Sequence, residues 1–155
     1  MQEEFMRAAI AESERGMNNN EGGPFGAVII KDGKIIGRGN NRVTSSNDPT
    51  AHAEISAIRN ACSAIENFDL SGSEIYTSCE PCPMCLAAIF WARIDKIYFA
   101  NTKKDAAGID FDDDFFYQEI DKPLTERSVP MQQMMREDAI KVFQAWTNKK
   151  DKIAY

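Results

Sequence analysis

Residues 25–40 read FGAVIIKDGKIIGRGN, which places a turn signal between two runs of strand-forming residues. Asp32-Gly33 lies between two runs of strand-forming residues, 25–30 and 34–40. An Asp-Gly pair in that position is a strong signal for a two-residue β-hairpin. The sequence therefore predicts an antiparallel pair of strands here.

The segments on either side of this hairpin predict a mixed α/β chain. Residues 1–19 carry apolar side chains at helical spacing, and so do the segments that follow Thr50, Pro81 and Pro130. Residues 74–78 and 94–100 are typical of strands, while residues 101–126 are acidic, irregular and expected to be partly helical. The order α-β-β-α-β-α-β-α predicts one domain over residues 1–155, with a mixed sheet and helices on both of its faces.

Composition narrows the class of partner. The chain has 155 residues, of which 43% are hydrophobic and 27% charged, as is typical of a globular protein. Its formal net charge is −6. Proteins that bind nucleic acid usually carry basic patches, because contacts with phosphate groups supply much of their affinity for it. Only short basic stretches occur here, at Lys103-Lys104 and at Lys149-Lys150 with Lys152. We expect a small-molecule substrate, no nucleic acid and no membrane.

The location expected from the sequence is the cytoplasm. No apolar run is long enough to span a membrane, and the acidic, amphipathic N-terminus does not resemble a signal peptide. In a reducing compartment, closely spaced cysteines favour metal binding over disulfides. Three of the four cysteines, Cys79, Cys82 and Cys85, are spaced in this way, while Cys62 lies in a helical pattern.

Two short motifs supply zinc ligands. The only histidine lies in Ala51-His52-Ala53-Glu54, and Pro81-Cys82-Pro83-Met84-Cys85 follows. Imidazole nitrogen and thiolate sulfur are the preferred zinc ligands, and a site with three protein ligands keeps its fourth position for water. His52, Cys82 and Cys85 are therefore predicted to bind one zinc ion per subunit, in the arrangement of catalytic zinc.

Both motifs are predicted at helix N-termini. Cys82 and Cys85 are three residues apart and share a helical face, where the helix dipole favours their thiolate forms. Glu54 is expected to hold its carboxylate beside the activated water rather than on the metal. Zinc lowers the pKa of such a water from about 15.7 to about 7.

An alternative interpretation is a closed zinc site. Cys79 precedes Cys82 by three residues, so three cysteines and His52 would form a Cys₃His module that performs no chemistry. Against this, Cys79 is expected at a strand end, and Glu54 would have no purpose in a closed site.

His-x-Glu followed by Pro-Cys-x-x-Cys is the pattern of zinc-dependent nucleobase deaminases. The chain resembles the cytidine/deoxycytidylate deaminase-like zinc-dependent superfamily and, within it, the bacterial guanine deaminases. The resemblance implies a three-layer α/β/α sandwich with a mixed five-stranded sheet. It implies hydrolysis of guanine to xanthine and ammonia in purine catabolism, and a homodimer that exchanges C-terminal segments, about residues 147–155. The resemblance rests on residues 22–28, 44–54, 76–86, 111–113, 117–123, 143–146 and Tyr155.

The resemblance also implies roles for individual residues. For Glu54 the chemistry of the zinc site itself already predicts the role of catalytic proton shuttle, which takes a proton from water, passes it to a ring nitrogen and helps to protonate the departing ammonia. The substrate-binding positions would be Asn41 at the guanine carbonyl, Phe25 and Trp91 lining or stacking on the ring, Asp113 and Tyr155 at the base, and Ala53. Asp113 is aligned from Phe111 and Phe115, and a shift of one residue would transfer its role to Asp112 or Asp114.

The zinc motif does not distinguish between the possible substrates of a deaminase. A deaminase of cytosine, of guanosine or of tRNA adenosine would carry the same ligands. A tRNA enzyme would be expected to show a basic C-terminal helix, whereas residues 131–146 balance Arg136 and Lys141 against Glu137 and Asp138.

Overall fold

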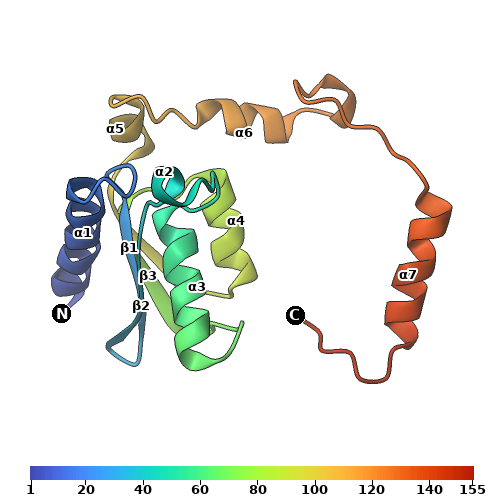
Figure 1. The fold of residues 1–155 in the computed structure, drawn as a ribbon, viewed down its shortest axis with the longest axis horizontal. Helices are drawn as coiled ribbons and strands as arrows, with labels where there is room; N and C mark the ends of the chain where they lie inside the picture. The colour runs from blue at the N-terminus through green and yellow to red at the C-terminus, as the bar shows by residue number, and fades with distance from the viewer. The chain divides into compact units, whose positions relative to one another are not determined.

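The computed structural model describes residues 1–155 as two compact units, Met1–Asp113 and Asp114–Tyr155, which are described in turn (Figure 1). The first unit contains every strand. Its elements, in chain order, are α1 (Gln2–Asn18), β1 (Gly26–Lys31), β2 (Lys34–Asn40), α2 (Val43–Ser46), α3 (Ala53–Ile65), β3 (Ser73–Cys79), α4 (Pro83–Trp91), β4 (Lys96–Asn101) and α5 (Lys103–Ala107).

One mixed sheet of four strands, in the order β2-β1-β3-β4, organises this unit. Strand β1 is antiparallel to β2 and to β3, whereas β3 and β4 are parallel. The expected α/β fold with a mixed sheet is confirmed, but the expectation of five strands is wrong. After Asn101 the chain forms only helices and irregular segments, because it contains no further run that alternates as a strand does.

The predicted hairpin between β1 and β2 is confirmed. Asp32 and Gly33 both have positive φ angles, 50° and 71°, and Lys31 pairs with Lys34 across the turn. Positive φ at both central residues defines the type I′ turn, whose twist matches that of the two strands. The Asp32-Gly33 pair was therefore sufficient to predict the turn between β1 and β2.

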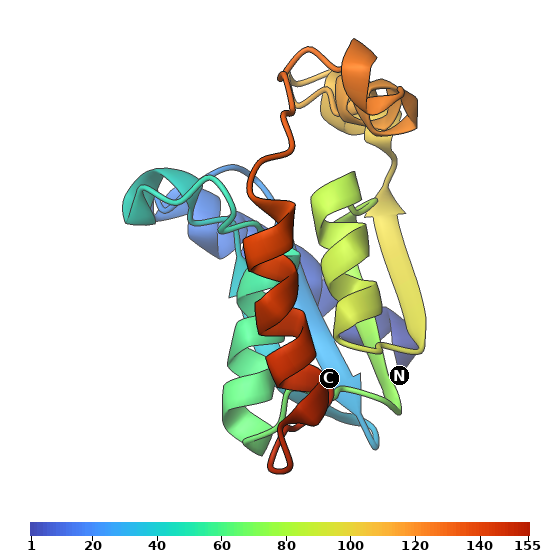
Figure 2. The same ribbon diagram turned by 90° about the vertical axis from the view of Figure 1, so that its right-hand side faces the viewer.

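Helices cover both faces of the sheet, which gives the predicted three layers (Figures 1 and 2). On one face, Ala9 of α1 packs with Val28, Ile30 and Tyr76 of the strands. The other face is covered by α3 and α4, through a core that includes the following buried residues: Ala53, Ala57, Ile29, Ile75 and Ile89. The sheet therefore separates two apolar clusters.

Helix α3 lies unusually close to β2. A Cβ atom at Gly39 would lie only 2.3 Å from the carbonyl oxygen of Ala53, and one at Gly37 only 2.5 Å from that of Ala57. Glycine on the strand and alanine on the helix therefore allow the two backbones to approach. This contact places the first residue of α3, directly after His52, against the end of β2.

The second unit contains α6 (Asp114–Asp121), a 3₁₀ turn (Leu124–Glu126) and α7 (Arg136–Asn148). The helix predicted over residues 131–146 is confirmed except at its start. Met135 has a left-handed backbone with φ of 49°, and the helix begins after it, with Glu137 and Asp138 in its first turn. Acidic residues stabilise a helix N-terminus, which accounts for this later start. No residue of α6 or α7 is buried.

Across the whole chain, no helix combines the length and the apolar character that crossing a membrane requires.

Candidate metal centre and active site

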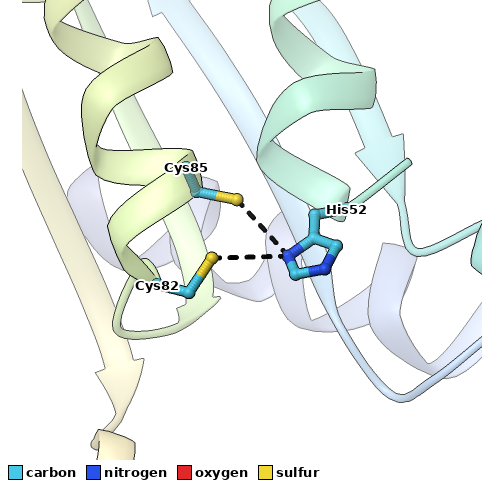
Figure 3. A group of neighbouring side chains, drawn as sticks. All are labelled: His52, Cys82 and Cys85. Atoms are coloured by element: carbon cyan, nitrogen blue, oxygen red, sulfur yellow. Dashed lines mark hydrogen bonds between the residues drawn. The ribbon is translucent and has the colours of Figure 1, made fainter. Parts of the chain in front are cut away.

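Two helix N-termini bring the metal motifs together. His52 is the N-cap of α3 and Cys82 the N-cap of α4, and each has an extended backbone with no hydrogen bond from its own side chain to the helix. Pro83 occupies the first turn of α4, where its missing N–H costs nothing. Both N-cap side chains are thus available to face each other, and Cys85 joins them from the first turn of α4 (Figure 3).

The three side chains fit a zinc ion. Nδ1 of His52 lies 3.6 Å from Sγ of Cys82 and 3.5 Å from Sγ of Cys85. Zinc bonds of about 2.0 Å to nitrogen and 2.3 Å to sulfur, in a tetrahedron, require nitrogen–sulfur separations of about 3.6 Å. The three ligand atoms all lie within 4.8 Å of one another, and Nδ1 is the histidine nitrogen that faces the sulfurs.

Cys79 does not join this cluster. Its sulfur lies 3.7 Å from the carbonyl oxygen of Thr102, the residue that directly follows β4. The potential ligands are therefore His52, Cys82 and Cys85 alone. The closed Cys₃His site is not formed, and a zinc ion held by three residues would keep a position for water.

The charges of the ligand residues are coupled. Donation from the Cys85 thiol and from His52 lowers the pKa of Cys82 to about 4, against the effect of burial. Donation to Cys82, together with burial, raises the pKa of Cys85. A thiolate is already favoured at Cys82, and a divalent cation would take the place of the protons that His52 and Cys85 share with it.

Glu54 lies in the first turn of α3, two residues after His52, and is only 6% exposed. Burial is the main cause that raises the pKa of this carboxyl to about 7. A cation bound nearby would lower that pKa again. A buried carboxylate is costly unless something compensates its charge, so its position beside the ligand cluster indicates a functional group.

Asn41 has a defined orientation. Its side chain is 5% exposed, and its Oδ1 accepts hydrogen bonds from the backbone N–H groups of Gly23 and Val43, each at 3.2 Å. The next residue, Arg42, donates its backbone N–H to the carbonyl of Ala51, beside His52, at 2.9 Å. The amide oxygen of Asn41 is thus satisfied internally, which leaves its NH₂ group to donate to a ligand.

Phe25 and Asp113 also belong to the first unit. Phe25 is half-buried and makes an edge-to-face contact with Phe111, with ring centroids 4.9 Å apart. Asp113 is partly buried, whereas Asp112 and Asp114 are exposed. Burial and then the charge of Cys82 raise the pKa of Asp113, so this carboxyl lies within electrostatic range of one metal ligand.

The other three residues predicted to bind the substrate lie in different parts of the structure. Ala53 is fully buried as the first residue of α3. Trp91 is the last residue of α4 and is 67% exposed, about 13 Å along the helix axis from Cys82. Tyr155 ends the second unit. In this chain the structure therefore does not bring Trp91 to the ligand cluster.

The sequence analysis did not predict the contacts that two residues, Phe111 and Asn40, make in this region. Phe111 served only to align Asp113, yet its ring contacts Phe25, 86 positions earlier in the chain. Asn40 was treated as part of a strand, yet it is 3% exposed and heavily hydrogen-bonded. An amide at a strand end, next to a second amide, was the available signal, but its partners are remote in sequence.

Comparison with known proteins agrees with this geometry. Residues 1–101 match the model of the cytidine and deoxycytidylate deaminase zinc-binding region. The chain is 51% identical to the guanine deaminase of Bacillus subtilis over 153 residues, which cover 99% of this chain and 98% of that protein. It is 40% identical to a tRNA-specific adenosine deaminase of Agrobacterium fabrum, over 74% of each chain.

Solved structures also match the chain. The crystal structure of guanine deaminase from Bacillus subtilis matches with a TM-score of 0.97 and 50% identity, covering 100% of this chain and 99% of that one. A guanine deaminase from Nitrosomonas europaea matches with a TM-score of 0.68 and 31% identity, covering 71% of this chain and 64% of that one. Together with the ligand cluster and its buried carboxylate, these matches establish that the chain belongs to the cytidine and deoxycytidylate deaminase family.

Proposed function

We propose that this protein hydrolyses guanine to xanthine and ammonia. The observation that carries the proposal is the extent of the similarity. The guanine deaminase of Bacillus subtilis matches nearly the whole chain, whereas the relatives named tRNA-specific adenosine deaminase match it at lower identity and over a smaller part of its length. The acidic net charge of −6 also favours a small base over tRNA. In this proposal residues 1–155 act as a single deaminase domain.

The chemistry falls to Glu54. When bound by His52, Cys82 and Cys85, zinc polarises water and lowers its pKa toward neutrality. Glu54 accepts a proton from that water and delivers it to a ring nitrogen of guanine. The water oxygen bonds to the carbon that bears the amino group. Glu54 then takes the remaining proton of that oxygen and passes it to the amino nitrogen, and the carbon–nitrogen bond breaks to release ammonia. Its burial excludes bulk water from this transfer.

Recognition of the base falls to the residues around the ligand cluster. The NH₂ group of Asn41 donates to the ring carbonyl, because its oxygen already accepts two backbone hydrogen bonds. Asp113 accepts hydrogen bonds from N–H groups of the base. The ring of Phe25 and the backbone and methyl group of Ala53 enclose the base. A site built on such bonds can reject an analogue that lacks them by about 10⁴–10⁵.

We also propose a homodimer in which residues 147–155 cross to the partner subunit, so that Tyr155 completes the partner's site. Helices α6 and α7 bury no residue, and α7 exposes Val142, Phe143 and Trp146. Exposed apolar surface of this kind marks an interaction site. Because Trp91 lies at the far end of α4, its contact with a base would likewise need the site of a second subunit.

The thiolate ligands favour a reducing location such as the cytoplasm.

The direct test is ammonia release from guanine, guanosine, cytosine, adenine and a tRNA anticodon stem, with the zinc-loaded protein. We expect turnover of guanine and rates at least about 100-fold lower for the others. Release from one of the others without release from guanine would replace the proposed substrate.

A further inference from the structure

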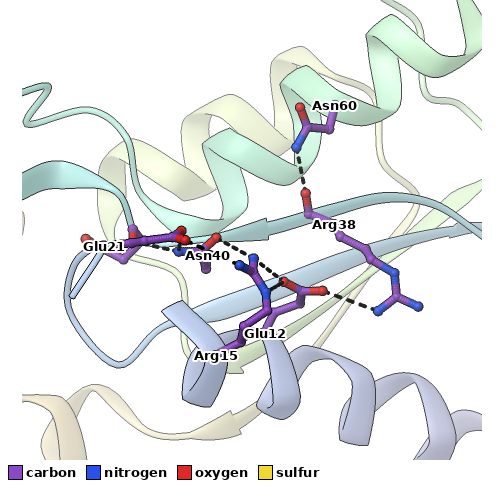
Figure 4. A network of polar contacts seen from close by, with 7 residues as sticks. Glu12, Arg15, Glu21, Arg38, Asn40 and Asn60 are labelled. Atoms are coloured by element: carbon purple, nitrogen blue, oxygen red, sulfur yellow. Dashed lines mark hydrogen bonds and ion pairs between the residues drawn. The ribbon is translucent and has the colours of Figure 1, made fainter. Parts of the chain in front are cut away.

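A polar network joins α1, the loop before β1 and the end of β2 (Figure 4). Its centre consists of Arg15, Glu21 and Asn40, here called the Asn40 network. We propose that Asn40 and Glu21 are positioning residues that determine which end of the Asn41 amide faces the substrate, and thereby the selectivity for a base with a ring carbonyl. This inference rests on the proposed function and deepens it.

Asn40 makes a complete set of contacts although it is 3% exposed. Its Nδ2 donates to a carboxylate oxygen of Glu21 at 2.9 Å and to the backbone carbonyl of Asn41 at 3.0 Å. Its Oδ1 accepts from the guanidinium of Arg15 at 2.9 Å. A buried amide that uses both of its ends has a single orientation, because turning it over would break all three hydrogen bonds.

The backbone of Glu21, a member of this network, is connected to both donors that hold Asn41. Glu21 lies two residues before Gly23, whose N–H is one of the two donors to Oδ1 of Asn41. The backbone carbonyl of Glu21 accepts from the N–H of Ser45 at 3.2 Å, within α2. Helix α2 begins at Val43, whose N–H is the second donor. Glu21 is therefore connected to Asn41 from both sides.

Two glycines provide the space for the two amides. A Cβ atom at Gly16 would lie 2.3 Å from Nδ2 of Asn40, and one at Gly22 would lie 2.3 Å from Oδ1 of Asn41. Both asparagine side chains thus pack directly against backbone. The arrangement leaves no room for either amide to move aside while its neighbours remain in place.

The orientation of Asn41 decides the polarity that a base meets. With Oδ1 bound to two N–H groups, NH₂ faces the ligand and complements a carbonyl oxygen. A turned amide would present its own oxygen to that carbonyl, and two acceptors repel. Loosening the Asn40 network should therefore lower selectivity for the carbonyl, and not stability alone.

The experiment compares Asn40→Ala and Glu21→Ala with Glu21→Gln, which keeps an oxygen to accept from Asn40. Asn60→Ala is the matched control, because the exposed Asn60 amide also donates to a backbone carbonyl of β2, that of Arg38, at 2.8 Å, but does not touch Asn41 (Figure 4). For each variant we would measure zinc content, thermal stability, and kcat and KM for guanine and for 2-aminopurine, which lacks the ring oxygen.

Asn40→Ala and Glu21→Ala should retain zinc and lower kcat/KM for guanine by at least about tenfold, the effect of one buried hydrogen bond. The ratio of kcat/KM for guanine to that for 2-aminopurine should fall by a similar factor. Glu21→Gln should retain most of this ratio, and Asn60→Ala all of it. An unchanged ratio in the alanine variants, or an equal fall in Asn60→Ala, would overturn the inference.

A second measurement does not depend on guanine turnover. Amide hydrogen exchange at Gly23 and Val43 should accelerate about tenfold in Glu21→Ala, a variant at a partly exposed position, and not in Asn60→Ala. Unchanged exchange would show that the network does not hold Asn41. If exchange accelerates but the unsubstituted protein releases no ammonia from guanine, the proposed substrate fails and the positioning of Asn41 stands.

Discussion

At the scale of single residues, the burial and the charge of Glu54 give the clearest indication of a function. It is buried in the first turn of α3, where the helix dipole favours its negative charge but burial opposes it. No residue among its neighbours forms a salt bridge with it. A buried carboxyl without a salt bridge, beside a site that fits zinc, is suited to move protons rather than to stabilise the fold.

Replacing Glu54 with Gln keeps the size of the side chain but removes the proton acceptor. We expect zinc to remain at one ion per chain and kcat to fall by about 10²–10⁴. Zinc analysis and a steady-state assay on the same sample check this. Wild-type turnover in the zinc-loaded variant would remove Glu54 from the proton pathway.

Cys79 gives a second prediction at this scale. Because its sulfur contacts Thr102 and not the ligand cluster, Cys79→Ser should keep its zinc, and X-ray absorption should still detect two sulfur ligands. The serine hydroxyl can still donate to the Thr102 carbonyl. Cys85→Ser, the matched change in a ligand, should lose most of its zinc. Equal zinc loss in both variants would mean that Cys79 is a ligand.

At the scale of secondary-structure elements, the approach of α3 to β2 positions the histidine. The backbone carbonyl of His52 accepts the N–H of Ser56 in the helix at 2.9 Å, but its side chain makes no capping hydrogen bond. Its place depends on Ala53 and Ala57 lying directly over Gly39 and Gly37. A packing contact between two elements thus becomes a requirement for metal binding.

Gly39→Ala tests this dependence. The new methyl group would lie 2.3 Å from the Ala53 carbonyl, so the helix must move, and the free energy of unfolding should fall by about 1–3 kcal/mol. Zinc affinity should fall as well, because His52 moves with the helix. Gly108→Ala is the control: Gly108 has a φ of −63°, and its new Cβ would lie 3.3 Å from the nearest atom. Chemical denaturation should place the control within about 0.5 kcal/mol of the unsubstituted protein.

At the scale of the whole molecule, the second unit is incomplete by itself. Its helices expose Val142, Phe143 and Trp146 and bury nothing, although residues 143–146 belong to the segments that led to the family resemblance. A helix with an apolar face gains most of its stability by packing that face against another surface. A second copy of the chain supplies such a surface in the proposed dimer.

A complementation experiment tests tail exchange. A chain truncated before Ala154 lacks Tyr155, and the Glu54→Gln chain lacks the proton acceptor, so each should be inactive as a homodimer. After subunit exchange, one site in each heterodimer would contain both Glu54 and a transferred Tyr155, and activity should reappear. Absence of activity in heterodimers verified by mass would indicate that each tail serves its own subunit.

Local signals in the sequence were enough for much of the molecule. The Asp32-Gly33 turn, the order of the elements and the zinc ligands all depend on residues that are neighbours in the chain or on the intrinsic chemistry of histidine and cysteine. The prediction failed where a decision depends on remote partners. The contact of Phe111 with Phe25 and the hydrogen bonds of Asn40 to Arg15 and Glu21 are two such cases.

Local patterns in the sequence were thus sufficient to predict a mixed α/β chain, its hairpin and the three side chains that can hold zinc. Only the tertiary structure decided that Cys79 faces Thr102, that Phe111 meets Phe25, and that the Asn41 amide presents its NH₂ group. The physical reason is the range of the interactions. Turn geometry and ligand chemistry act over a few residues, whereas the direction of a buried polar side chain is set by donors and acceptors that folding brings from distant positions.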